Sequence, residues 1–182
     1  AFLLRRLPAE DRRTLSDPRV RIAHDDPRRF FRTSREHFDL IVLLLPDPVT
    51  LRTSRLTTRE AFSDVAATLS PSGVVVVTAR TAPNVVTGET AALAGSLFGT
   101  LSTVFHVVRA TPGPDSLLVA GRDASAVTLR PDALAERFRA RRIVSTSFSP
   151  DLFPLIFPEG RVATLERSLR EASALVPPST DD

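Results

Sequence analysis

The sequence contains no cysteine, methionine, tryptophan or tyrosine, and its 24 basic residues are all arginine because lysine is absent too. Without cysteine, disulfide bonds and thiolate metal sites are excluded, and three scattered histidines do not form a metal cluster. We therefore expect no metal site. The redox compartment stays open, since a chain without cysteine is compatible with any compartment.

The arginines raise the isoelectric point to about 11, although the formal net charge is only +3. They occur in pairs separated by acidic residues, and neither tyrosine nor tryptophan is available to stack on bases. Nucleic-acid binding needs a concentrated basic surface, and arginine pairs spread in this way are more typical of solvent-exposed helix faces. We expect no nucleic-acid partner.

The sequence also lacks a signal-peptide pattern and any apolar run long enough to span a bilayer. Its 182 residues, 42% of them hydrophobic, can supply the core of one domain. We expect that domain over residues 1–175 and a disordered tail over 176–182, where the sequence VPPSTDD is polar and rich in proline. Because the chain begins at Ala1 without a methionine, we expect a fragment of a longer protein.

Continuous apolar runs alternate with helix-like segments along the chain. Such runs are typical of strands buried on both faces, and the alternation predicts an α/β fold with a largely parallel sheet. The expected strands cover residues 19–23, 38–45 and 73–79, followed by an antiparallel hairpin of residues 104–110 and 116–122.

The intervening segments predict helices with recognisable starts. Asp26 is expected to cap a helix that begins at Pro27, and Thr57 with Glu60 is expected to form a capping box for a helix over residues 57–70. Further helices are expected over residues 87–103, 131–141 and 162–174.

Several motifs, in this order, resemble the spermidine synthase family of aminopropyltransferases: RIAHDDPRRFF, FDLIVLLLPDPV, LTTREAF and SLFGTLSTVFHVVRATPGPDSLLVAGRD. The Leu-Pro-Asp-Pro segment is closer still to a bacterial subfamily that is often fused to a membrane transporter-like domain. The resemblance implies a class I methyltransferase-like Rossmann domain with strand order 3-2-1-4-5-7-6. It also implies that the first two strands are not in this chain.

The same resemblance assigns candidate site residues. Asp26, or its neighbour Asp25, matches the acid that binds the adenine amino group of an S-adenosyl cofactor. Asp47 matches one of two active-site aspartates, whereas Arg55 and Asn84 lie in segments that face the substrate. Plainer alternatives stay open, namely a helix cap for Asp26, a turn acid for Asp47, a solvated charge for Arg55 and a turn residue for Asn84.

Two departures from the family pattern bear on activity. Leu44 occupies the position of the aspartate that receives the proton of the attacking amine, and a leucine cannot take a proton. No Gly-x-Gly occurs in the chain, so the glycine-rich loop that cradles the cofactor is not in this sequence.

These observations favour the C-terminal part of a transferase that uses S-adenosylmethionine or its decarboxylated form to modify a small-molecule amine. The alternatives are a non-catalytic relative that has lost its general base, or a small-molecule methyltransferase. The resemblance implies a homodimer located in the cytoplasm, with the parent protein anchored in the inner membrane if the fusion is present. The fragment alone is expected to be inactive, and the long apolar strand 38–45 is expected to promote association.

Overall fold

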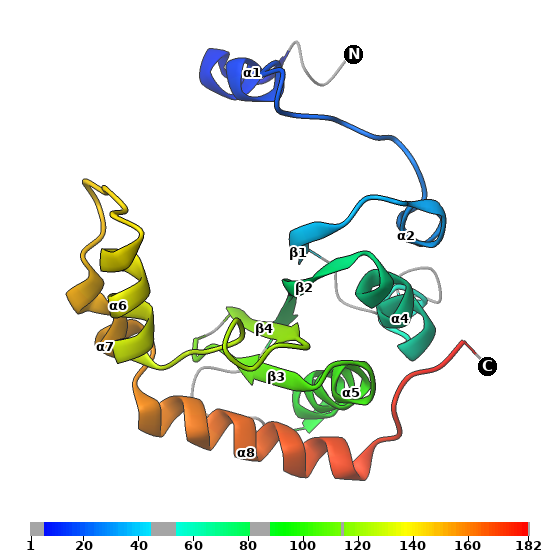
Figure 1. Cartoon of the computed structure of the whole chain (residues 1–182). Helices are drawn as coiled ribbons and strands as arrows, with labels where there is room; N and C mark the ends of the chain where they lie inside the picture. The colour runs from blue at the N-terminus through cyan, green and yellow to red at the C-terminus, as the bar shows by residue number, and fades with distance from the viewer. Residues whose placement is uncertain (1–5, 45–53, 81–87, 114, 182) are drawn as a thin grey trace.

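The structure, a computed structural model, describes residues 6–44, 54–80, 88–113 and 115–181 (Figure 1). A four-stranded mixed sheet lies at its centre, in the order β1-β2-β4-β3. Its strands are β1 (Phe38–Leu43), β2 (Leu69–Arg80), β3 (Val107–Ala110) and β4 (Asp115–Gly121). β1 and β2 are parallel, whereas β4 pairs antiparallel with both β2 and β3. This order is the 4-5-7-6 half expected from the resemblance, and the predicted α/β fold class is confirmed.

The helices α4 (Arg59–Ala67), α5 (Gly88–Val104) and α8 (Glu159–Leu175) share one hydrophobic core with the sheet. The register pairs Ile41 with Val75 and Leu43 with Val77, so these side chains point to the same face. Phe62 of α4, Leu101 of α5 and Leu169 of α8 are fully buried in this core. In contrast, Leu40 and Val42 point to the opposite face and are more than half exposed.

The remaining helices surround this unit. α2 (Pro27–Thr33) packs on α4, while α1 (Ala9–Leu15) stands apart from the sheet (Figure 1). A separate helical lobe contains α6 (Pro131–Ala140), the 3-10 helix η2 (Pro150–Leu152) and α7 (Phe153–Ile156). Ring contacts hold this lobe together, with Phe148 at centroid distances of 5.7 Å from Phe138 and 5.0 Å from Phe153. None of the helices in the described ranges combines the length and apolar character needed to cross a bilayer.

The strand predicted over residues 19–23 is wrong. The segment has no strand structure, and Val20 and Ile22 are about half exposed. A strand needs a hydrogen-bonding neighbour, and the described residues place none beside this segment. Within the described sheet, β1 pairs only with β2.

The predicted capping box of Thr57 and Glu60 is also wrong. Thr58, not Thr57, caps α4, and its hydroxyl accepts a hydrogen bond from the amide of Ala61 at 3.2 Å. Thr57 instead donates to the carbonyl of Ser54 at 2.8 Å. The carboxylate of Glu60 is turned toward Arg59 and the amide of Asp181, so it does not complete a box.

The C-terminal segment differs from the expected disordered tail. Residues 176–181 run back along α4 and α5, where the Ser179 carbonyl accepts from the Arg59 amide and the Ser179 amide donates to the Thr100 hydroxyl. A proline-rich polar sequence predicts a chain end that makes few apolar contacts. Its hydrogen-bond partners on α4 and α5 lie far away in the sequence, so the sequence of the segment does not reveal them. This segment reaches the region that contains the candidate site.

Candidate functional site

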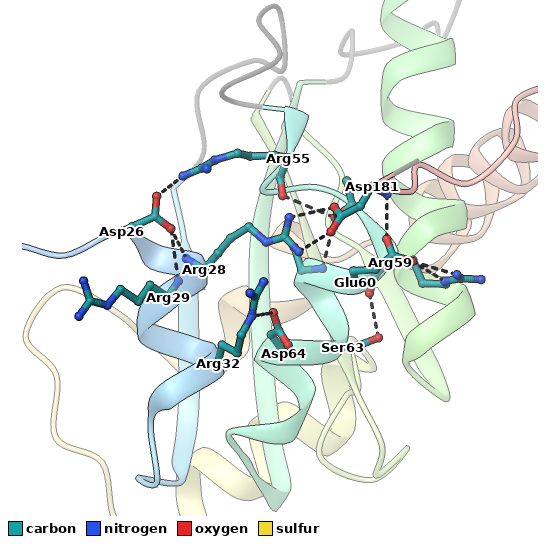
Figure 2. Close-up of polar contacts among 12 residues, drawn as sticks. Asp26, Arg28, Arg29, Arg32, Arg55, Arg59, Glu60, Ser63, Asp64 and Asp181 are labelled. Atoms are coloured by element: carbon teal, nitrogen blue, oxygen red, sulfur yellow. Dashed lines mark hydrogen bonds and ion pairs between the residues drawn. The ribbon is translucent and has the colours of Figure 1, made fainter.

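The candidate site lies where the first turns of α2 and α4 approach each other (Figure 2). Asp26 precedes α2, Arg55 and Thr58 precede α4, and Asp181 arrives from the end of the chain. An ion pair between Arg32 and Asp64, at 3.6 Å, joins the two helices further along. The site therefore depends on how α2 packs against α4.

Asp26 is the best-defined residue of the site. As predicted, it caps α2, and one carboxylate oxygen, Oδ1, accepts from the amides of Arg28 at 3.1 Å and Arg29 at 3.3 Å. The other oxygen, Oδ2, accepts from the guanidinium group of Arg55. The amide of Arg29, together with the charge of Arg55 and the amide of Arg28, holds the pKa of Asp26 below its ordinary value of 3.8. The side chain is consequently a carboxylate at neutral pH.

Asp25 has a different role from its neighbour. Its Oδ1 accepts a hydrogen bond from the amide of Asp26 at 2.8 Å, and the side chain is exposed. This bond orients the turn that leads into α2. Asp25 thus supports the position of Asp26 and also presents a carboxylate to solvent at the same corner.

Arg55 is the second predicted residue that the structure brings to this place. It pairs with Asp26, which lies 29 positions earlier in the chain, and no sequence pattern identifies this partner. Asp47 and Asn84 lie outside the described residues, so their predicted roles remain predictions. Leu44 follows the end of β1, and its side chain is 74% exposed.

Sequence reasoning missed Arg28, Thr58 and Asp181. The guanidinium of Arg28 donates to both carboxylate oxygens of Asp181, at 2.9 and 2.7 Å, and Thr58 Oγ1 donates to Oδ1 at 2.8 Å. Arg28 and Asp181 are 153 positions apart, and no linear pattern connects them. The only available signals were the helix start at Pro27 and the acidic end of the sequence.

The Asp26 carboxylate has room for one further donor. A carboxylate offers about four lone-pair positions, and the described amides of Arg28 and Arg29 and the guanidinium of Arg55 use three of them. Among the described residues, no group of three or more His, Cys, Asp or Glu side chains could hold a metal ion.

Comparison with known protein families identifies the family of this chain. The family signature of the spermine/spermidine synthase domain matches residues 3–106. The comparison with curated protein sequences gives no match.

Two solved structures share the fold. A spermidine synthase in complex with the transition-state analogue AdoDATO superimposes with a TM-score of 0.67 at 17% identity, over 91% of this chain and 56% of that one. Spermidine synthase from Thermotoga maritima gives a TM-score of 0.62 at 15% identity, over 91% of this chain and 54% of the other. This chain therefore spans a little more than half the length of the structures that it resembles.

Proposed function

Since the chain belongs to the spermine/spermidine synthase family, we propose that it is part of a transferase domain that binds an S-adenosyl cofactor and transfers an aminopropyl group to a small amine. The observation that carries this proposal is the Asp26 carboxylate, which is held in its charged form at the start of α2 with one acceptor position left. A spermidine synthase that shares the fold is complexed with AdoDATO.

In this proposal, the residues at the corner of α2 and α4 bind the nucleobase end of the cofactor. Asp26 accepts the adenine amino group, with Asp25 as the neighbouring alternative, and Arg55 keeps the carboxylate of Asp26 oriented. When bound, a sulfonium cofactor supplies an alkyl group whose bond to sulfur breaks as the amine nitrogen attacks. Asp47, Arg55 and Asn84 are proposed to face the amine, and the cofactor is proposed to be S-adenosylmethionine or its decarboxylated form.

Leu44 favours a second candidate, a relative that binds the cofactor but does not transfer the aminopropyl group. Its apolar side chain is largely exposed directly after β1, at the position where the family resemblance places the proton-accepting aspartate. A positioned general base typically contributes about 10²- to 10⁴-fold to a rate, so its loss would leave little activity. A small-molecule methyltransferase is the third candidate, because it would use the same cofactor corner.

The wider context of the domain is also a proposal. The Leu-Pro-Asp-Pro segment supports membership of the bacterial subfamily that is fused to a transporter-like membrane domain. In that arrangement the transferase domain would face the cytoplasm, with the parent protein anchored in the inner membrane. A homodimer is proposed on family resemblance.

Calorimetric titration of the parent protein with S-adenosylmethionine and with its decarboxylated form tests the proposal. Asp26→Asn is the informative variant, because asparagine caps helices as well as aspartate does but lacks the second charged oxygen. We expect this change to weaken binding by about tenfold or more, while Asp123→Asn, in a distant loop, leaves binding unchanged.

The activity of the same protein is then measured as aminopropyl transfer to putrescine, with the product identified by mass spectrometry. Transfer supports the first candidate, and binding without transfer to any amine supports the second. Absence of binding to either cofactor in a correctly folded parent protein would reject both.

A further inference from the structure

Arg28 is a buried cation that the proposed cofactor site does not use. Its side chain is only 13% exposed, and it extends from α2 toward the first turn of α4 (Figure 2). Both terminal nitrogens bind Asp181, while Nε is buried without a hydrogen-bond partner among the described residues. The carboxylate of Asp181, helped by Asp64 and Glu60, raises the pKa of Arg28. The burial of this charge depends on an acidic group that comes from the far end of the chain.

The partners of Asp181 and Ser179 come from three helices. Thr58 Oγ1 donates to the Asp181 carboxylate at 2.8 Å, and the amide of Asp181 donates to Glu60 at 3.1 Å. The carbonyl of Ser179 accepts from the amide of Arg59, and its amide donates to Thr100 Oγ1, both at 2.9 Å. Backbone and side chain of the tail are therefore recognised together, as in peptide binding.

The surface that receives the tail is already built by the folded domain. Thr58 caps α4, Thr100 is fully buried on α5, and the amide of Arg59 is one of the free donors at the start of α4. The tail itself contributes little apolar area, since Thr180 and Asp181 are exposed. A contact that consists of charge-assisted and neutral hydrogen bonds can open without loss of the hydrophobic core.

We infer that Arg28, Thr58 and the first turn of α4 form a binding site for the carboxylate of an extended peptide, and that residues 179–181 are its resident ligand. Because Arg28 belongs to α2 and Thr58 to α4, the bound tail fastens these two helices together. Asp26 directly precedes α2, and the carbonyl of Arg55 accepts from Thr58, so the tail stabilises the corner at which Asp26 and Arg55 meet. The inference does not depend on which cofactor, if any, binds there.

Amide hydrogen exchange of the complete chain, followed by NMR, tests the site directly. In Asp181→Asn and in Arg28→Gln we expect the Arg59 amide to exchange about tenfold faster. Arg29→Gln is the matched control, because it removes the same charge from the next residue of α2, whose side chain points away from Asp181 (Figure 2). Equal exchange in Arg28→Gln, Asp181→Asn and the unchanged protein would overturn the inference.

A second experiment asks whether the site binds a peptide supplied separately. The complete chain with Asp181→Arg, which repels its own tail from Arg28, is titrated with the free peptide VPPSTDD. We expect saturable shifts at Arg59 and Thr100, and about a tenfold weaker effect when the first aspartate of the peptide is replaced by asparagine. Shifts that are absent, or that are the same for both peptides, would reject a carboxylate-specific site.

A charge-swapped variant controls for damage to the fold. Arg28→Asp combined with Asp181→Arg restores an opposite-charge pair, and we expect it to recover most of the Arg59 protection that Arg28→Asp alone loses. Failure of the double variant to recover protection, in a protein with unchanged far-UV circular dichroism, would also count against the site.

Discussion

Glu166 is a buried carboxylate on the face of α8 that meets the edge of the sheet. Its side chain is 3% exposed, and it accepts from Arg109 of β3 at 3.1 Å and from Arg170 at 3.0 Å. The amide of Ala110 also donates to it, at 3.4 Å. A buried charge is tolerated when such donors surround it, and here they join α8 to the outermost strand.

We expect Glu166→Ala to lower the free energy of unfolding by about 1–3 kcal/mol, because the Ala110 amide loses its acceptor in a buried position. Urea denaturation followed by circular dichroism measures the change. Glu171→Ala, on the exposed side of the same helix, is the control and should shift the free energy of unfolding by less than about 0.5 kcal/mol. Equal effects of the two substitutions would contradict the structural role of Glu166.

For single residues, the sequence predicted those roles that depend on neighbours in the chain. Asp26 followed by proline indicates a helix cap, and the structure has that cap because both partners lie within three positions. The pairs Asp26–Arg55 and Arg28–Asp181 were not predictable, since among 24 arginines a sequence offers no means of choosing the partner. The packing of α2 on α4 and the path of the tail determine which arginine pairs with which carboxylate.

At the scale of elements, α5 and α8 approach each other unusually closely. A Cβ atom at Gly95 would lie 2.6 Å from the Ala172 Cβ and 2.9 Å from backbone atoms of Ala172 and Ser173. At Gly99 the Cβ would lie 3.1 Å from the Ser173 Cβ. Glycine is required at position 95 because the two helix backbones leave no space for a side chain.

Gly95→Ala is therefore expected to destabilise the fold by about 1–3 kcal/mol, through overpacking that exceeds the gain in helix propensity. Gly160→Ala serves as the comparison. It is also a helical glycine, in the first turn of α8, but nothing lies within 4 Å of its added Cβ. Thermal unfolding should show a lower melting temperature for Gly95→Ala and an unchanged or higher one for Gly160→Ala. Stabilisation by both substitutions would show that the helices separate easily.

The elements themselves were largely predictable, with errors that have physical causes. The runs FDLIVLLL and GVVVV became β1 and the centre of β2. Burial on both faces, which such runs predict, is not found in β1, where Leu40 and Val42 are exposed. The segment RVRIA, in which arginine alternates with β-branched residues, remains outside the described sheet, since a strand is stable only beside a neighbour. The observed bounds of α4 differ from the predicted ones by a few residues, because Thr58 caps the helix in place of its neighbour Thr57.

For the molecule as a whole, several carboxylates are held in their charged form by arginines and backbone amides. Hydrogen bonds from Arg28 lower the pKa of Asp181, and the Arg29 amide lowers the pKa of Asp26. The unfolded chain, with ordinary pKa values near 3.8, binds more protons in acid than the folded chain does. The stabilisation is thus present above this range and is lost as the pH falls through the folded-state values.

We expect the free energy of unfolding to be nearly constant above about pH 5 and to fall below about pH 4. The side chains of Asp26 and Asp181 are 39% and 37% exposed, so salt can screen their attraction to arginine. Added salt should therefore weaken the dependence of the free energy of unfolding on pH in acid. Urea titrations at several pH values, with and without about 0.5 M sodium chloride, measure both effects. A free energy of unfolding that rises on acidification would contradict this account.

β1 forms one edge of the described sheet and exposes apolar side chains beside that edge. Leu40 and Val42 are 59% and 51% exposed, and the outer hydrogen-bonding groups of the strand have no neighbouring strand in the described residues. We expect copies of this chain to associate through β1 as concentration increases, which sedimentation velocity would detect. Leu40→Lys with Val42→Lys should reduce association, whereas Val144→Lys with Leu155→Lys, equally apolar but distant, should not. A monomer at all concentrations would contradict this expectation.

The contact between α5 and α8 also determines when part of the fold can form during synthesis. α5 is complete at Val104, but α8, which packs against its face at Gly95 and Gly99, ends only at Leu175. At about 5–20 residues per second, the ribosome needs several seconds to make the intervening chain. Throughout that interval, the face of α5 that carries Gly95 and Gly99 lacks its partner helix. The packing that requires glycine at position 95 therefore forms only after α8 has been synthesised.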